Sequence, residues 1–351
     1  MIKNDFTFLS SNKTTNIHAI ECIPENGQYT RVIQIKMKKN EFTFLSSDEK
    51  TYIHAIECLP EDTKVTRVFQ IIHGMCEYID RYIPFIEFLT SKGFIVVGHD
   101  HLGHGESINT DDDLGYFGEP DPNDLLIKDI NTLRTQTQEK YPNLPYFILG
   151  HSMGSYLLRQ YICSYSEGLS GIIISGTGYI GSCTTFMALG LLNVMACFKG
   201  MRHRSDFIRK MTLESGQYKQ YDLEKKDVNN YWISRDPVIV EKYYSDKKCQ
   251  FNFTINGYFG LINAVKFSCD ASNVANINKD IPILFISGDN DPVGDNGEGV
   301  QKSYDIFKLV GSEDVTMKLF EGCRHEVLNE LNKDEVYEYI LNWIDEKMPL
   351  K

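Results

Sequence analysis

The sequence has no excess of positive charge: its 351 residues carry a formal net charge of −12. General nucleic-acid binding needs clustered Lys and Arg to neutralise phosphates, so a protein of that class is not expected. Attraction to an anionic membrane by charge alone is not expected either, although a local apolar patch can still contact lipid.

Long apolar runs are also missing. Residues 1–6 contain no apolar signal-peptide core. The longest apolar run, residues 186–198, is interrupted by Gly190 and Asn193, and we expect it to be too short to span a bilayer. The nine cysteines form neither a CxxC pair nor a Cys/His metal pattern. We therefore expect a cytoplasmic protein with reduced thiols and no bound metal.

Residues 4–35 and 40–71 are copies of one another. The offset is 36 residues, and 21 of the 32 aligned positions are identical. Each copy has the pattern of two strands joined by a polar turn, followed by the start of a third. We interpret residues 1–36 as a duplicated leading β-hairpin segment. Two near-identical segments cannot pair in the same place, so the alternatives are an extra layer, an addition to a sheet edge, or a poorly ordered copy.

The rest of the chain alternates between strand-like and helix-like segments. Strands are expected at 68–73, 94–98, 146–149, 171–175, 281–287 and 315–320, and helices at 83–91, 124–140, 155–166, 300–310 and 335–347. Several of the strands are almost wholly apolar, as in a sheet covered on both faces. The pattern predicts an α/β fold with a mostly parallel central sheet flanked by helices. Residues 37–180 and 276–351 are assigned to this core.

The alternation lapses between residues 181 and 275. An apolar run at 186–192 is followed by a basic, polar segment at 199–219 and by aromatic pieces at 231–233 and 243–244. This composition predicts an inserted helical lid, or cap. The alternative is a set of ordinary surface helices with a small core of their own.

The most informative stretch is Gly150-His151-Ser152-Met153-Gly154, between a strand-like run and a helix-like run. A serine in a Gly-x-Ser-x-Gly pattern between strand and helix sits on a sharp turn that exposes its hydroxyl. Side chains at the two glycine positions would collide with the neighbouring strand and helix. Ser152 is therefore the predicted nucleophile.

A serine hydroxyl needs a histidine to take its proton and a carboxylate to orient that histidine. His325 follows the expected strand 315–320, and Asp291 follows the expected strand 281–287. This is the chain order Ser, Asp, His that a nucleophile elbow requires. Asp289 is a rival carboxylate, but it lies closer to the strand end, where it is better placed to brace the loop.

Acyl transfer also needs N–H donors for the oxygen that becomes negative. The backbone amides of Met153, after the nucleophile, and of Met75, in the loop 73–77, are the predicted oxyanion donors. A second loop, residues 98–107, contains three histidines and two carboxylates, which is also compatible with a metal site. Its glycines and its position directly after a strand favour a structural turn instead.

Together these motifs resemble the α/β-hydrolase superfamily, and within it the monoacylglycerol lipase and lysophospholipase-like serine hydrolases of the serine aminopeptidase S33 type. The matching segments are 73–78 with Arg81 and Tyr82, 100–107, 150–154, 288–292 and 324–326, and residues 232–249 are similar to the lid of bacterial members. The resemblance covers roughly residues 40–351 and leaves out the extra copy.

The resemblance implies the α/β-hydrolase fold and hydrolysis of a carboxylic ester through an acyl-serine, without a cofactor. The apolar lid favours a lipid-like small-molecule ester, monoacylglycerol or lysophospholipid, and transient membrane contact through the lid. The alternatives are an aminopeptidase, a short-chain esterase or a thioesterase of the same fold, and a non-catalytic ligand-binding homologue. No oligomeric state is predicted.

Overall fold

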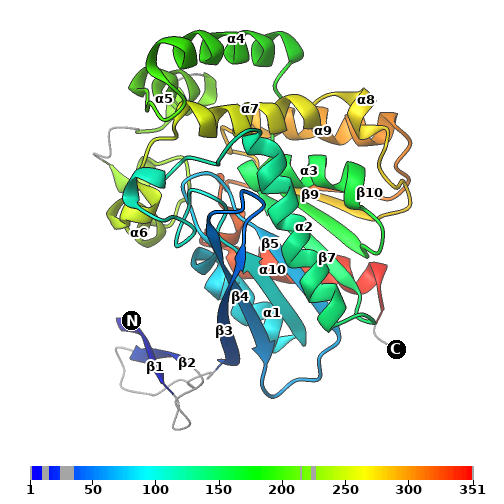
Figure 1. The fold of residues 1–351 in the computed structure, drawn as a ribbon. Coiled ribbons are helices and arrows are strands. Elements are labelled where there is room, and N and C mark those ends of the chain that lie inside the picture. The colour runs from blue at the N-terminus through cyan, green and yellow to red at the C-terminus, as the bar shows by residue number, and fades with distance from the viewer. Residues whose placement is uncertain (1, 10–15, 24–34, 214–215, 223–226, 350–351) are drawn as a thin grey trace.

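A computed structural model describes residues 2–9, 16–23, 35–213, 216–222 and 227–349, with side chains from residue 37 onward except those of Leu213 and Val228. The described strands form one sheet of ten in the order β1-β2-β3-β4-β6-β5-β7-β8-β9-β10 (Figure 1). The strands are β1 (Ile2–Leu9), β2 (Asn16–Ile23), β3 (Ile35–Leu45), β4 (Tyr52–Pro60), β5 (Arg67–Ile72), β6 (Phe94–His99), β7 (Tyr146–His151), β8 (Gly171–Ser175), β9 (Ile283–Gly288) and β10 (Val315–Phe320).

Helices connect the strands. They are α1 (Ile83–Ser91), α2 (Pro122–Lys140), α3 (Met153–Tyr165), α4 (Ser182–Lys199), α5 (Asp206–Leu213), α6 (Pro237–Ser245), α7 (Ile255–Ser268), α8 (Ala271–Val274), α9 (Glu298–Leu309) and α10 (Lys333–Lys347). The pairs from β6 through β5 to β10 are parallel, whereas those from β1 to β4 and between β4 and β6 are antiparallel. Parallel neighbours need long crossovers, which the helices supply. The predicted α/β fold with a mostly parallel sheet is confirmed.

Alternate side chains of β5 face two separate cores. Val68 and Ile72 join the core beneath α2, α3 and α9, whereas Phe69 and Ile71 join the core beneath α1 and α10. Helices therefore cover both faces of the sheet, which is why its central strands carry few polar residues. The buried Gln70 of β5 is satisfied by the Tyr146 hydroxyl at 2.7 Å.

Most predicted elements differ from the observed ones by only a few residues. Strand β7 continues beyond the predicted end at 149 to His151, and α3 begins at Met153, so the turn between them contains only Ser152. Helix α2 begins at Pro122 because the Asp121 side chain accepts from the amides of Asn123 and Asp124 and caps the helix.

The backbone of the first copy forms a hairpin at the edge of the sheet. Ile2 pairs with Ile23 in β1–β2, and Lys38 pairs with Leu59 in β3–β4, which is the same register 36 residues later. Strand β2 then pairs with the start of β3 through Ile17–Lys36 and His18–Ile35. Of the three arrangements considered for the duplicated segment, the described strands form the addition to the sheet edge. The boundary of the segment at residue 36 stays a prediction.

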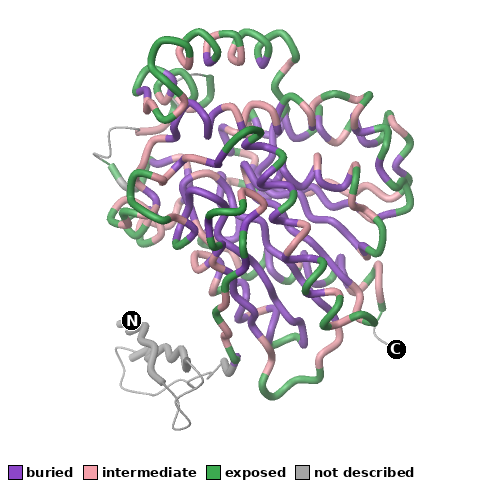
Figure 2. The backbone as a smooth tube through the Cα atoms, in the orientation of Figure 1, coloured by how far each residue is buried: buried purple, intermediate pink, exposed green. Residues whose placement is uncertain are grey.

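The segment from 181 to 275 contains outer and inner helices. Helices α4, α5 and α6 lie on the outside, whereas α7 packs against α2, α3 and α4 and contributes Tyr258, Ala264 and Val265 to the main core (Figures 1 and 2). The inner helix is thus part of the hydrophobic core. Only the outer helices have the exposure expected of a lid, and the lid boundaries stay a prediction.

The prediction that the apolar run is too short to span a bilayer is wrong. It belongs to α4, which has 18 residues and is, by length and composition alone, long and apolar enough to cross a membrane. Neither interruption ends the helix: Asn193 donates its side-chain amide to the Leu189 carbonyl at 2.8 Å, and a side chain at Gly190 would meet open space.

Candidate active site

The turn between β7 and α3 holds Ser152 in a rare backbone conformation. Its φ is 52° and its ψ −119°, a region that non-glycine residues seldom adopt. The Ser152 amide is tied to the Ser175 carbonyl of β8 at 2.9 Å. A Cβ at Gly150 would lie 2.3 Å from the Gly154 carbonyl oxygen, and one at Gly154 would lie 2.2 Å from that of Ile72. Both glycines are therefore required by close backbone approach.

Two loops from the C-terminal end of the sheet bring Asp291 and His325 together. Ring nitrogen Nδ1 of His325 lies 3.0 Å from each carboxylate oxygen of Asp291. Both side chains are buried. The Ser287 hydroxyl and the Val293 amide also donate to Asp291, at 3.0 and 2.9 Å, and hold the carboxylate in place.

Asp289 lies in the same loop and has different hydrogen-bond partners. Its Oδ1 accepts from the Gly322 amide at 2.7 Å and from the Asn290 side chain at 2.9 Å. These bonds join the loop after β9 to the loop after β10. Asp291, and not Asp289, is the carboxylate on the His325 ring.

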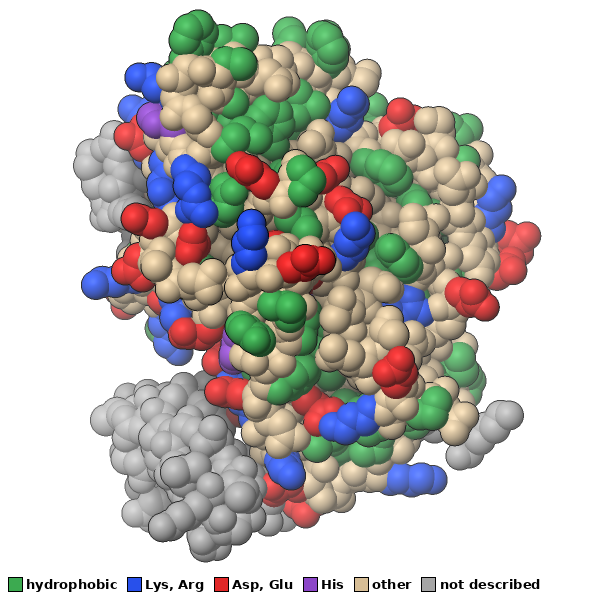
Figure 3. Space-filling view, viewed as in Figure 1, with side chains coloured by type: hydrophobic (Ala, Val, Ile, Leu, Met, Phe, Trp, Pro, Cys, Tyr) green, Lys and Arg blue, Asp and Glu red, His purple; other side chains and the backbone are tan. Residues whose placement is uncertain are grey.

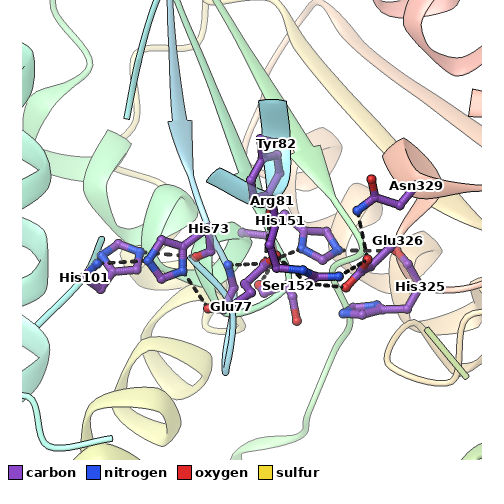
Figure 4. A network of polar contacts seen from close by, with 12 residues as sticks. His73, Glu77, Arg81, Tyr82, His101, His151, Ser152, His325, Glu326 and Asn329 are labelled. Carbon is purple, nitrogen blue, oxygen red and sulfur yellow. Dashed lines mark hydrogen bonds and ion pairs between the residues drawn. The ribbon is translucent and has the colours of Figure 1, made fainter. Parts of the chain in front are cut away.

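The His325 ring lies next to the serine turn. Its centroid is 4.7 Å from that of His151, the residue before Ser152. A Cβ at Gly176, directly after the strand end that holds the Ser152 amide, would lie 3.1 Å from Cε1 of His325. Figure 4 shows the Ser152 hydroxyl and the ring projecting into the same region. No hydrogen bond joins them within the described residues; such bonds often form only when a substrate binds.

The predicted oxyanion amides belong to the residue after Ser152 and to a loop that approaches Ser152. Met153 is the first residue of α3, so its amide has no partner one turn earlier in the helix and lies at the positive end of the helix dipole. Met75 follows Gly74, whose Cβ, if present, would lie 2.8 Å from the Ser152 Cβ. The loop after β5 therefore lies against Ser152, the predicted nucleophile.

A segment of the predicted lid closes over the histidine. The Trp232 ring lies 5.0 Å from the His325 ring, and the Trp232 carbonyl accepts from the His325 amide at 3.3 Å. Arg324 donates to the carbonyls of Tyr231 and Ser234 at 2.6 and 3.1 Å. The sequence predicted Trp232 only as part of an aromatic lid segment. Its contact with the histidine is tertiary and leaves no local signal.

The histidine-rich loop 98–107 is a structural turn that fastens the loop after β5. Asp100 accepts from His54 Nδ1 at 3.0 Å and from the Ile79 amide at 2.8 Å. The His101 amide donates to the His73 ring at 2.9 Å. Burial lowers the pKa of His99 and of His104 to about 3, so both rings are neutral. Among the described residues, no group of three or more His, Cys, Asp or Glu side chains has an arrangement suited to a metal ion.

A comparison with protein families adds to this geometry. The family described as "Serine aminopeptidase, S33" matches residues 63–332, more than half of the chain. The chain belongs to this family. Its sequence is 24% identical over 285 residues to a human monoglyceride lipase, covering 79% of this chain and 82% of that protein. It is 26% identical over 278 residues to a monoacylglycerol lipase of Mycolicibacterium smegmatis, covering 78% and 86%.

Solved structures of esterases and lipases have the same fold as this chain. A thermostable carboxyl esterase from Bacillus coagulans, solved with glycerol, has a TM-score of 0.80 and 30% identity, covering 88% of this chain and 98% of that one. A soluble variant of the monoglyceride lipase from Saccharomyces cerevisiae, solved with a substrate analog, has a TM-score of 0.69 at 18% identity, covering 89% and 96%, and shows the fold alone. The chain is thus a hydrolase with the α/β-hydrolase fold, related to ester-cleaving enzymes.

Proposed function

We propose that the protein is a serine ester hydrolase that works through an acyl-serine on Ser152. The observation that carries the proposal is the Asp291–His325 pair at 3.0 Å beside a serine held on a strained turn. In this mechanism His325 is the base and acid, and Asp291 orients it. The backbone amides of Met75 and Met153 are the proposed oxyanion donors.

The chemistry follows from the free nitrogen of the His325 ring. Because Nδ1 is bonded to Asp291, Nε2 is left to take the Ser152 proton as the hydroxyl oxygen attacks the ester carbonyl. The tetrahedral intermediate collapses when Nε2 returns that proton to the departing alcohol, which leaves the acyl group on the serine. Water then attacks the acyl-serine, with the same nitrogen as base, and releases the acid and the free hydroxyl.

The substrate we favour is a lipid-like ester, a monoacylglycerol or a lysophospholipid. Large apolar side chains gather on the exposed face of α4 (Figure 3): Phe186, Met187, Val194 and Phe198. Exposed apolar patches on a water-facing helix mark interaction sites. The relatives named monoglyceride lipase and monoacylglycerol lipase support the same class of substrate.

We further propose that α4 rests on a membrane surface while substrate enters. The segment after α4 is tied to the inner helix, because the amides of Ile255 and Asn256 donate to the His203 and Met201 carbonyls at 2.9 and 3.0 Å. A helix held in this way suits contact in the plane of the interface. Phe198 and Lys199, at its end, would place a ring in the acyl region and a charge among headgroups.

We also propose a cytoplasmic location. The eight described cysteines are free thiols, and Cys183 and Cys197 on α4 are exposed. Exposed free thiols persist in a reducing compartment. Fractionation of cells that express the tagged full chain would test the proposal, and recovery of the protein only from an oxidising compartment would contradict it.

Covalent labelling tests the catalytic proposal. A fluorophosphonate probe should label the wild type on Ser152 alone, as read by peptide mapping, and should not label Ser152→Ala. Labelling elsewhere, or full turnover by Ser152→Ala, would refute it. A comparison of monoacylglycerols, lysophospholipids and short p-nitrophenyl esters with aminoacyl amides then identifies the substrate; faster cleavage of the amides would favour an aminopeptidase.

A further inference from the structure

A buried network of charged and polar side chains lies beside the candidate active site (Figure 4). It contains two carboxylates, an arginine, a histidine and two neutral donors: Glu77, Glu326, Arg81, His151, Tyr82 and Asn329. None of them takes part in the acyl-transfer steps above. Burying so many charges is unfavourable unless every one is paired, so their arrangement needs its own explanation.

Glu77 is the centre of this network. Its Oε1 accepts from the Gly74 amide and, at 2.9 Å, from the Tyr82 hydroxyl. The same oxygen lies 2.8 Å from Nδ1 of His151, and Oε2 lies 3.3 Å from Nη1 of Arg81. One carboxylate therefore joins the loop after β5, the 3-10 turn η1 (Ile79–Tyr82) and the end of β7.

The bond to Gly74 acts on the proposed oxyanion site. Gly74 immediately precedes Met75, and a Cβ at Gly74 would lie 2.6 Å from Oε1 of Glu77 and 2.8 Å from the Ser152 Cβ. The loop backbone is thus held between the carboxylate and the nucleophile. Its position determines where the Met75 amide points.

The bond to His151 acts on the serine turn. Nδ1 of His151 faces Glu77, and Nε2 lies 3.4 Å from the carbonyl oxygen of His325. An acceptor at each nitrogen favours the doubly protonated imidazole. Burial disfavours this cation, but the Glu77 carboxylate outweighs that effect and holds the pKa of His151 above its ordinary value. The residue before Ser152 is thereby linked to the backbone of the catalytic histidine.

Arg81 extends the network to the loop that carries His325. Its two Nη atoms each donate to the Glu326 carboxylate at 2.8 Å, and Asn329 donates to the same group at 2.9 Å. Glu326 is the residue after His325. Neutralising Glu77 would therefore leave Arg81 with the Glu326 carboxylate alone and would remove the group that favours the charged form of His151.

We propose that Glu77 is a positioning residue for the ester hydrolysis proposed above, on which this role rests. Its carboxylate aligns three loops, those of the oxyanion amides, the nucleophile and the catalytic histidine. It touches no reacting atom, and its effect is on the geometry of the transition state.

The variant Glu77→Gln tests this role, because it keeps the shape of the side chain and removes its charge. The expected result is a fall in kcat of about 100-fold with KM changed by no more than about 2-fold. The affinity for a boronic acid that mimics the tetrahedral intermediate should fall in parallel with kcat. The labelling rate by fluorophosphonate should fall as well.

Glu57→Gln is the matched control. Glu57 in β4 is also a buried carboxylate with several partners, namely Lys140, Tyr141 and Asn40, and none of them belongs to the network. This variant should lower Tm and leave kcat unchanged. If folded Glu77→Gln behaves in the same way, with wild-type kcat and boronate affinity, the positioning role is refuted.

A milder variant covers the case in which Glu77→Gln does not fold. Tyr82→Phe removes one donor to the same oxygen and should lower kcat about 5-fold at constant KM, the equivalent of one hydrogen bond. Wild-type kcat in Tyr82→Phe would then overturn the proposal. Failure of the underlying function looks different, because the wild type itself would not be labelled on Ser152.

Discussion

The imidazole of His325 is held by Asp291 through both carboxylate oxygens, at 3.0 Å each, although 34 residues separate the two along the chain. The Asp291 carboxylate is in turn held by the Val293 amide and the Ser287 hydroxyl. The ring is therefore fixed in the tautomer that leaves Nε2 free.

Asp291→Asn should lower kcat by about 10⁴-fold, because the amide stabilises the wrong tautomer and cannot offset a developing imidazolium. The circular dichroism spectrum should not change. Asp289→Asn is the control, and it should keep kcat within about 3-fold because that residue braces a loop through the Gly322 amide. Equal losses in the two variants would contradict the assignment.

Trp232→Ala should lower kcat/KM by about 10-fold or less, since an aromatic pair contributes about 0.5–1.5 kcal/mol. The ring lies 5.0 Å from that of His325, and we expect it to limit the rotation of the histidine. Trp232→Phe should recover most of the loss in steady-state kinetics. Trp343→Phe, in the core beneath α10, changes the only other tryptophan and should affect stability alone.

Acid should destabilise the fold through the buried histidines. Burial lowers the pKa of His99 to about 3, so the unfolded chain binds a proton there that the folded chain does not. The free energy of unfolding therefore falls as pH drops below about 6.5, by up to about 1.4 kcal/mol per pH unit for this residue. His99→Leu should flatten the slope of unfolding free energy against pH, measured by urea denaturation, by that amount. Neither His99 nitrogen has a hydrogen-bond partner among the described residues, so leucine leaves no such bond unmade. An unchanged slope would show that His99 does not titrate in this range.

The double variant Phe186→Ser/Phe198→Ser should weaken binding to phospholipid vesicles by more than about 10-fold, because each ring buried in lipid contributes about 1.5–3 kcal/mol. Hydrolysis of a water-soluble p-nitrophenyl ester should stay the same. Leu309→Ser/Leu331→Ser is the matched control, since those leucines are 77% and 64% exposed, against 73% and 82% for the phenylalanines, and lie outside the lid segment. Equal loss in both double variants would argue against a specific surface on α4.

Deletion of residues 1–36 should leave turnover within about 2-fold of wild type, because β3 and β4 keep the edge of the sheet through their own pairing. The measurement is ester hydrolysis together with Tm. Loss of all turnover in a shortened chain that still folds would show that the first hairpin takes part in catalysis.

The positions of Ser152, Asp291 and His325 could be predicted because each follows a strand, and the C-terminal ends of parallel strands meet at one edge of a sheet. Chain order and turn chemistry are local properties of the sequence. They favoured Asp291 over Asp289. The different hydrogen bonds of the two carboxylates became visible only in three dimensions.

Other features depend on contacts between distant residues. Glu77 and His151 are 74 residues apart, and Trp232 reaches His325 from the lid segment. No local pattern shows such pairs. The length of α4 was underestimated because Gly190 and Asn193 resemble helix breakers, whereas an internal side-chain bond and open surroundings let the helix continue.

Because α7 is buried in the main core, the inserted segment divides into an inner helix that belongs to the core and outer helices that lie on it. Helix α4 lies on this inner helix between Gly181 and Met201, so we expect that it can be exchanged for the corresponding helix of a related enzyme at these two junctions. Such chimeras would test whether substrate preference follows α4 while Ser152, Asp291 and His325 stay in place.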